Sequence, residues 1–179
     1  MAREPFEGYL SDVETGEFLI DYLLLNLPER FGIQRVLEGG AFAELGCGTG
    51  DVVAAIKSRY PQVEAIGTDI NEDYLREAHQ KSPDSIFVAS SLRRLPFADR
   101  SLPYLFSWRI YQLCNEDRAP EILAEAFRVL KPGGVYLLCC EFFQEDELIQ
   151  FHSQIESAGF KIAMHSGWDY AALVKPLKI

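Results

Sequence analysis

The sequence predicts an α/β fold in which helices cover both faces of a doubly wound, mostly parallel sheet of seven strands. Short apolar runs alternate along the chain with amphipathic or capped stretches, and this alternation is typical of strand–helix–strand units with right-handed crossovers. The run over 135–140 is almost continuously apolar, as expected for a strand covered on both sheet faces. Only a few residues separate the last two apolar runs, too few for a crossover, so these strands should pair antiparallel.

Two helices are expected before the first strand. A capping-box spacing from Ser11 opens an apolar-periodic helix over 13–27, and a second, short helix is expected over 28–37. We therefore expect a single domain, with an N-terminal helical cap over 1–40 and an α/β core over 41–179.

In the core, apolar runs predict the strands, while caps such as Asn71 and stop signals such as the KPGG sequence of 131–134 mark the helices. Pro103 is poorly suited to a central strand, which leaves open a later start of the fourth strand. The predicted strands span Ala41–Leu45, Val63–Thr68, Ser85–Ala89, Leu102–Ser107, Val135–Cys140, Phe160–His165 and Ala171–Lys175. The predicted helices span Asp51–Arg59, Asn71–Lys81, Arg118–Leu130 and Glu145–Ala158.

Composition and charge limit the function classes. The chain of 179 residues carries a net charge of −10, a field that repels nucleic acid, so DNA binding is not expected and an RNA acceptor is disfavoured. No apolar run approaches the ~20 residues of a membrane span, and the first residues lack the apolar region of a signal peptide, so we expect a soluble, cytoplasmic protein. The 4 cysteines and 3 histidines show no metal-ligand spacing, and no metal site is expected.

The stretch ELGCGTGD, residues 44–51, follows the first predicted strand and opens a helix. Its alternate glycines let a ligand approach the backbone at the carboxyl end of a strand, where doubly wound sheets bind ligands. A nicotinamide or flavin fingerprint needs glycine at its first, third and sixth positions, but Asp51 stands at the sixth. No Gly-Lys-Ser/Thr follows, so the loop is not a P-loop. A nicotinamide-dependent oxidoreductase is therefore a disfavoured alternative.

The pattern E-x-G-x-G-x-G over 44–50 instead resembles the first motif of the class I S-adenosylmethionine-dependent methyltransferases. Three further segments match this family in order and spacing: GTDIN over 67–71, LPFADRSL over 95–102 and FRVLKPGG over 127–134. The resemblance implies a Rossmann-like fold, S-adenosyl-L-methionine as cofactor, and methyl transfer. That cofactor carries a sulfonium, an ammonium and a carboxylate but no phosphate, so a loop beside acidic residues suits it.

The resemblance also implies a set of cofactor-binding residues. Asp69, at the end of the second strand, is the expected acceptor for the two ribose hydroxyls, with a simple helix cap as the alternative. Ile70 is expected against the adenine face and Glu44 near the cationic end of the cofactor. For the glycine loop the alternative is a tight strand–helix turn that holds no ligand. The implied set is Glu44, Gly46, Cys47, Gly48, Gly50, Asp69, Ile70, Ser91, Leu92 and Trp108.

Two positions depart from the pattern of the family. Many relatives carry an acid just before the LPF segment that meets the adenine amino group, and here the position is Ser91, a weaker acceptor than a carboxylate. Many relatives also have Phe-Asp at the start of the fourth strand, where this chain has Leu102 and Pro103. These departures bear on adenine affinity and on the entry of the fourth strand.

The resemblance places the methyl group at the ends of the fourth and fifth strands, beneath the N-terminal cap. The substrate-facing candidates are Tyr9, Arg109, Tyr111 and Gln112, and Glu141 or Tyr111 is the candidate base for an acceptor that needs one. Packing or a solvated turn is the alternative for each. Trp108, Arg109 and Tyr111 could stack on and pair with an acidic or planar acceptor. The short substrate region predicts an open pocket that a large acceptor, a homodimer or a partner subunit would close.

Three functions remain open at this point. The first is methyl transfer to a small-molecule acceptor. The second keeps the same cofactor but modifies a protein or an RNA. The third is a catalytically silent regulatory or assembly subunit, which the loss of the acid at Ser91, the proline at Pro103 and the short substrate region motivate. The intact glycine motif favours an active enzyme.

Overall fold

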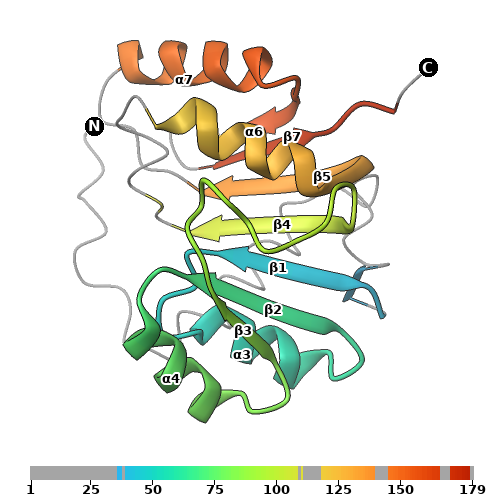
Figure 1. The fold of residues 1–179 in the computed structure, drawn as a ribbon. Helices are drawn as coiled ribbons and strands as arrows, with labels where there is room; N and C mark the ends of the chain where they lie inside the picture. The colour runs from blue at the N-terminus through green and yellow to red at the C-terminus, as the bar shows by residue number, and fades with distance from the viewer. Residues whose placement is uncertain are drawn as a thin grey trace, which may run out of the picture.

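A computed structural model describes residues 36–37, 39–108, 110, 118–139, 145–165 and 170–177. It contains one seven-stranded sheet of order β3-β2-β1-β4-β5-β7-β6 (Figure 1). The strands are β1 (Ala41–Leu45), β2 (Glu64–Asp69), β3 (Ile86–Ala89), β4 (Leu102–Trp108), β5 (Leu130–Cys139), β6 (Lys161–His165) and β7 (Tyr170–Val174). The helices with full bounds are α3 (Asp51–Arg59), α4 (Glu72–Lys81), α6 (Ala119–Val129) and α7 (Glu145–Ser157). The expected helices before the first strand lie outside the described residues, except that 36 and 37 are helical.

The strand directions confirm the predicted doubly wound sheet. The strands β1 to β5 pair in parallel with one another. β7 pairs antiparallel with both β5 and β6. The short connection between the last two strands therefore makes the antiparallel pair that its length requires.

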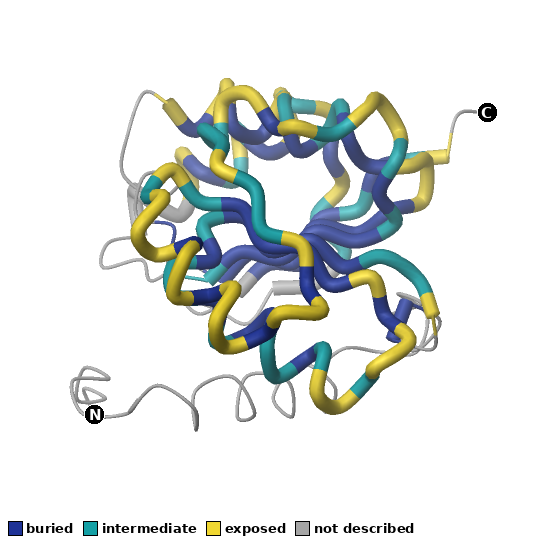
Figure 2. The backbone as a smooth tube through the Cα atoms, turned by 60° about the horizontal axis from the view of Figure 1, so that its bottom comes forward, coloured by how far each residue is buried: buried dark blue, intermediate teal, exposed yellow. Residues whose placement is uncertain are grey.

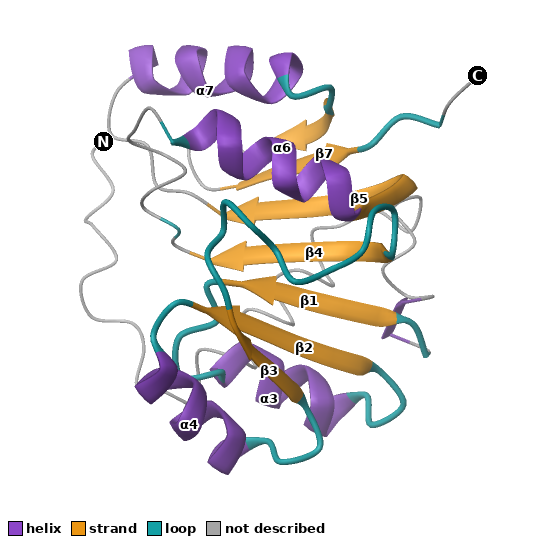
Figure 3. Cartoon of the chain, viewed as in Figure 1, coloured by secondary structure: helices purple, strands orange, loops and turns teal. Residues whose placement is uncertain are grey.

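The sheet separates two apolar layers, so helices lie on both faces as predicted (Figure 3). Successive residues of a strand point to opposite faces. Leu105 of β4 accordingly packs with α6 and α7, while its neighbour Phe106 packs with α3 and α4. Figure 2 shows the buried strands between helices whose outer surfaces are exposed.

β4 starts at the predicted residue, whereas the start of β5 differs from the prediction. β4 begins at Leu102, so the alternative of a start after Pro103 is wrong. The ladder pairs Leu102 with Leu130 and next Tyr104 with Val135, so Pro103, which has no backbone N–H to donate, lies at an irregularity of the ladder. The expected start of the fifth strand at Val135 is also wrong, because the helix already ends at Val129 and the KPGG segment belongs to β5.

The sheet topology fixes where a ligand can bind. β1 pairs with β2 on one side and with β4 on the other, so the chain winds outward in one direction to β3 and then in the other direction from β4. Ligands of such sheets bind at this reversal, beyond the carboxyl ends of the strands. Within the part of the chain that the structure describes, none of the helices has the length and apolar character needed to cross a membrane.

Candidate functional site

A pocket of about 340 Å³ opens at this reversal. The carboxyl ends of β1, β2 and β4, the start of the β3–β4 loop and the N-terminal end of α6 surround it. Its lining consists of Gly46, Asp69, Ile70, Ser90, Ser91, Leu92, Arg93, Trp108, Ile110, Arg118 and Ile122. The pocket thus brings together six of the predicted cofactor-binding residues, from segments far apart in the sequence.

The glycine loop is anchored to β2 by its backbone. The amides of Gly46 and Cys47 both donate to the carbonyl oxygen of Thr68, at 2.7 and 2.9 Å. Gly48 has a φ of +51°, and a Cβ built there would meet no atom of the described residues within 4 Å, so a ligand can approach its backbone. The side chain of Cys47 is buried, and burial raises the pKa of its thiol.

Gly50 was expected with the cofactor-binding residues, but the structure gives it a packing role. Its φ is +77°, and a Cβ at this position would lie 2.6 Å from the Cβ of Ala78 on α4. The backbone of Gly50 begins α3, so its missing side chain makes room for the contact between α3 and α4.

Asp69 connects the end of β2 to the glycine loop. Its Oδ2 accepts a hydrogen bond of 2.9 Å from the amide of Gly48, and its Oδ1 accepts one of 2.9 Å from the amide of Asn71. A carboxylate oxygen can accept a second bond, so both oxygens retain capacity toward the pocket. The cap of α4 is Asn71, whose Oδ1 accepts from the amides of Asp73 and Tyr74. Asn71 therefore takes the helix-cap role that was the alternative for Asp69.

Glu44 lies buried at the end of β1. Its Oε2 has no hydrogen-bond partner among the described residues. Burial, and secondly the negative charges of Asp51 and Asp69, raise the pKa of this carboxyl well above its usual range, and a hydrogen bond from the amide of Val53 offsets only part of the effect. A cation bound nearby would reverse this shift, because it favours the charged carboxylate.

The outer end of the pocket carries Ile70, Ser91 and Leu92. The side chain of Ile70 is 76% exposed, so a flat apolar ligand can cover it. The hydroxyl oxygen of Ser91 already accepts a long hydrogen bond of 3.3 Å from the amide of Arg93, which leaves its O–H to donate to a ligand.

Five lining residues were missed by sequence reasoning: Ser90, Arg93, Ile110, Arg118 and Ile122. Arg93 lies in the predicted loop between the third and fourth strands, and Arg118 stands at the start of a predicted helix. The available signal was position, since Arg93 comes two residues after the predicted site residue Ser91. Both arginines contribute guanidinium groups to the lining, and that of Arg93 lies 3.5 Å from Oε2 of Glu121 on α6.

The remaining candidates lie outside the described residues. They are the substrate-facing Tyr9, Arg109, Tyr111 and Gln112, together with Glu141, the other candidate base. Their roles stay predictions.

Comparison with known proteins addresses the family directly. The model of a family described as "Methyltransferase domain" matches residues 42–134, more than half of the chain. The ubiquinone/menaquinone biosynthesis C-methyltransferase UbiE of Desulfotalea psychrophila is 34% identical over 109 residues, which cover 59% of this chain and 44% of that protein. The chain thus spans less than half the length of this curated relative.

Solved structures agree with the family match. A TehB-like SAM-dependent methyltransferase from Corynebacterium glutamicum superimposes with a TM-score of 0.65 at 16% identity, over 93% of this chain and 98% of the other. A Haloferax volcanii putative methyltransferase complexed with its activator Trm112 gives a TM-score of 0.68 at 15% identity, over 94% and 97%. At such identities the likeness shows the fold. With the family model matched across the glycine loop, Asp69 and the β3–β4 loop, the chain belongs to the methyltransferase domain family.

Proposed function

We propose that this chain uses S-adenosylmethionine to methylate a small-molecule acceptor. The observation that supports the proposal is the hydrogen bond between the carboxylate of Asp69 and the amide of Gly48, because it holds a carboxylate that can accept from a diol beside the backbone of the glycine loop. When bound, the cofactor supplies a methyl group on a positively charged sulfur, already activated for displacement.

The residues present fit this cofactor. Asp69 has acceptor capacity for the two ribose hydroxyls, and the exposed side chain of Ile70 suits the adenine face. The space above Gly48 would be filled by any Cβ-bearing residue. The buried Oε2 of Glu44, which has no hydrogen-bond partner in the described ranges, suits a cationic ligand, because a nearby positive charge compensates a buried carboxylate.

The chain's own contribution to the reaction is alignment. Methyl transfer needs the acceptor in line with the breaking bond, so the pocket must position both partners and exclude water. Arg93 and Arg118 favour an acceptor with an anionic group, and Trp108 a planar one. We assign acceptor contacts to Tyr9, Arg109, Tyr111 and Gln112, with Glu141 or Tyr111 as the base. The name of the curated relative, a C-methyltransferase of quinone biosynthesis, supports a small organic acceptor.

Calorimetric titration with S-adenosylhomocysteine tests cofactor binding, and transfer of labelled methyl groups to a panel of planar acceptors, with and without a carboxylate, tests turnover. Asp69→Asn is the matched variant, because it keeps the size of the side chain. The proposal expects binding that the variant weakens and transfer that favours the carboxylates. Absence of binding to the wild-type protein would contradict the cofactor assignment.

A protein or RNA acceptor, or a silent subunit, is the second candidate. The Haloferax volcanii neighbour was solved with an activator protein, which favours a partner-dependent role. Binding of S-adenosylhomocysteine without transfer to any small acceptor would support this candidate over the first.

A further inference from the structure

We propose that Glu121, Glu125 and Arg128, three charged residues on one face of α6, form a clamp that holds the β3–β4 loop in the position where it makes a wall of the pocket. They are positioning residues, since they act on the ligand through the loop. The inference rests on the proposed function, in that the ligand at this wall is S-adenosylmethionine.

The loop has two parts with different tasks. Its first residues, from Ser90 to Arg93, line the pocket, and its later residues, 95–101, run along α6. One end is tied to β2, because the amide of Ser90 donates to the carbonyl oxygen of Asp69 at 2.9 Å. The wall can keep its place only if the other end is also held.

Arg128 uses all five donors of its guanidinium, three of them on the loop. Its Nη1 donates to the carbonyl of Phe97 at 2.9 Å and to Asp99 at 2.7 Å. Its Nη2 donates to the carbonyl of Leu95 at 3.1 Å and to Glu125 at 2.9 Å, and its Nε donates to Glu125 at 2.8 Å. A planar five-donor fork matches this set of acceptors, whereas the point charge of a lysine does not.

Glu125 binds both the loop and Arg128, and thereby orients the guanidinium. Its Oε2 accepts a hydrogen bond of 2.9 Å from the amide of Leu95, while both its oxygens receive Arg128. The hydrogen bond from Arg128 is the main cause that lowers the pKa of Glu125. The carboxylate is therefore charged near neutral pH, where it serves both partners.

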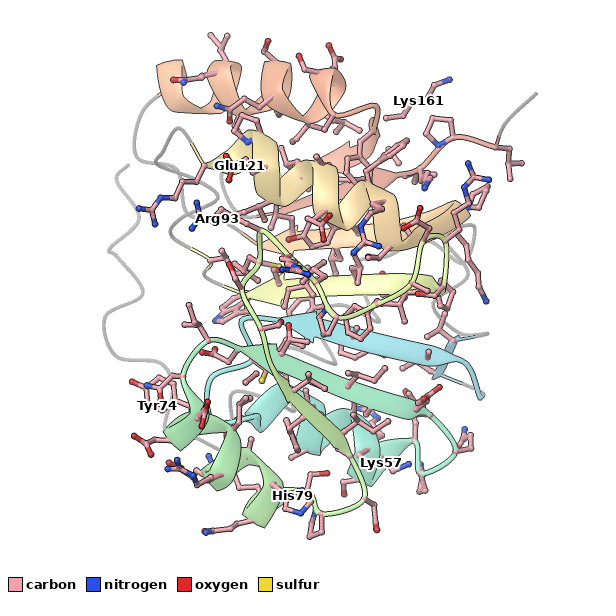
Figure 4. All side chains as sticks on the ribbon, in the orientation of Figure 1. Lys57, Tyr74, His79, Arg93, Glu121 and Lys161 are labelled. Atoms are coloured by element: carbon pink, nitrogen blue, oxygen red, sulfur yellow. The ribbon has the colours of Figure 1, made fainter. Side chains whose placement is uncertain are left out.

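Glu121 extends the clamp to the pocket wall. Its Oε2 lies 3.5 Å from a guanidinium nitrogen of Arg93, and Figure 4 shows the two side chains next to each other, one from the loop and one from α6. The spacing of 121, 125 and 128 puts the three side chains on one helix face. The same helix turn also binds the loop by backbone, since the amide of Arg100 donates to the carbonyl of Arg128 at 2.9 Å.

The geometry separates this role from general folding. The side chain of Leu95 is buried in the α6 layer, so apolar packing anchors the loop to the core in addition to the charged contacts. Weakening the clamp should therefore loosen the wall and leave the core packed. Substitutions that touch no ligand atom change ligand affinity by about 2- to 30-fold through such an element.

The test compares Arg128→Lys and Glu125→Gln with Arg76→Lys. Arg76 is the matched control, since it pairs with Asp73 on the exposed face of α4, away from the loop. Calorimetry should show the dissociation constant of S-adenosylhomocysteine raised about tenfold by each clamp substitution and unchanged by the control, at unchanged helix content. Combined with Leu92→Ala, the effect of Arg128→Lys should shrink, because Leu92 is part of the wall through which the clamp acts; a merely structural role would give additive losses.

Amide hydrogen exchange of the ligand-free protein gives a second readout. Leu95, whose amide donates to Glu125, should exchange faster in both clamp variants. Wild-type protein that does not bind S-adenosylhomocysteine overturns the proposed function, and the positioning role with it. Tight wild-type binding with unchanged affinity in both variants overturns the positioning role alone, as does additivity with Leu92→Ala.

Discussion

Gly48 and Gly50 stand two residues apart with similar backbone conformations, but the structure predicts different consequences when each is changed to alanine. Their φ angles are +51° and +77°, where an L side chain is strained. This strain costs each variant about 1–2 kcal/mol. What distinguishes the two positions is the space that the new methyl group would enter.

At Gly50 the new Cβ would lie 2.6 Å from the Cβ of Ala78 and 3.2 Å from its Cα, a backbone atom of α4 that cannot move alone. Overpacking of this kind adds about 1–3 kcal/mol, so the total for Gly50→Ala is about 2–5 kcal/mol. At roughly 3 °C per kcal/mol for a domain of this size, its melting temperature should fall by about 6–15 °C.

At Gly48 the new Cβ meets no atom within 4 Å in the part of the chain that the structure describes, so the strain is the expected cost and the melting temperature should fall by about 3–6 °C. The methyl group would instead enter the space next to Asp69, where we place the cofactor. Gly48→Ala should therefore raise the dissociation constant of S-adenosylhomocysteine by about tenfold or more, because overpacking would destabilise the complex by about 1–3 kcal/mol.

Thermal unfolding by circular dichroism and calorimetric titration at 15 °C measure the two quantities separately. Equal destabilisation by Gly48→Ala and Gly50→Ala would refute the contact assigned to α3 and α4. A Gly48→Ala variant that binds S-adenosylhomocysteine like the wild-type protein would refute the approach of the cofactor to this backbone.

Three further predictions concern buried and polar groups. Burial raises the pKa of the Glu44 carboxyl, so the folded state keeps the carboxyl proton to higher pH than the unfolded state does. The free energy of unfolding of the wild-type protein should therefore fall as pH rises from the unfolded-state pKa to the folded-state pKa. Urea titrations across this range should show a flatter pH dependence for Glu44→Gln. Cofactor binding should also release a proton in the wild-type protein and not in Glu44→Gln, as calorimetry in buffers of different ionisation enthalpy would show. Ser91→Asp should tighten S-adenosylhomocysteine by about 3- to 10-fold, because a carboxylate accepts from the adenine amino group more strongly than a hydroxyl; unchanged affinity would contradict the placement of Ser91 at the base. Lys175→Met should lower the melting temperature by about 5–12 °C, because Nζ of the buried Lys175 donates to the carbonyls of Phe127 and Leu130 at 2.6 and 2.9 Å, while S-adenosylhomocysteine affinity should stay unchanged.

The sequence alone determined the elements whose signals are local. α3 spans the predicted residues, and α4 begins after the predicted cap Asn71, because caps, stops and apolar spacing act within a few residues. The mostly parallel, doubly wound sheet with an antiparallel last pair could be predicted as well, since right-handed crossovers leave few topologies for alternating strands and helices. Asp69 could be selected because a strand end in such a sheet is also an edge of the ligand site.

Only the tertiary structure decided what depends on contacts between distant segments. The space that a side chain at Gly50 would need is occupied by Ala78. The start of β5 depends on its ladder with β4 around Pro103. The wall of the pocket is placed by Arg128, more than thirty residues after Ser91. Sequence periodicity and helix caps do not specify these contacts. Which side chains meet across the sheet, or where a loop packs on a helix, depends on the packing of the whole chain.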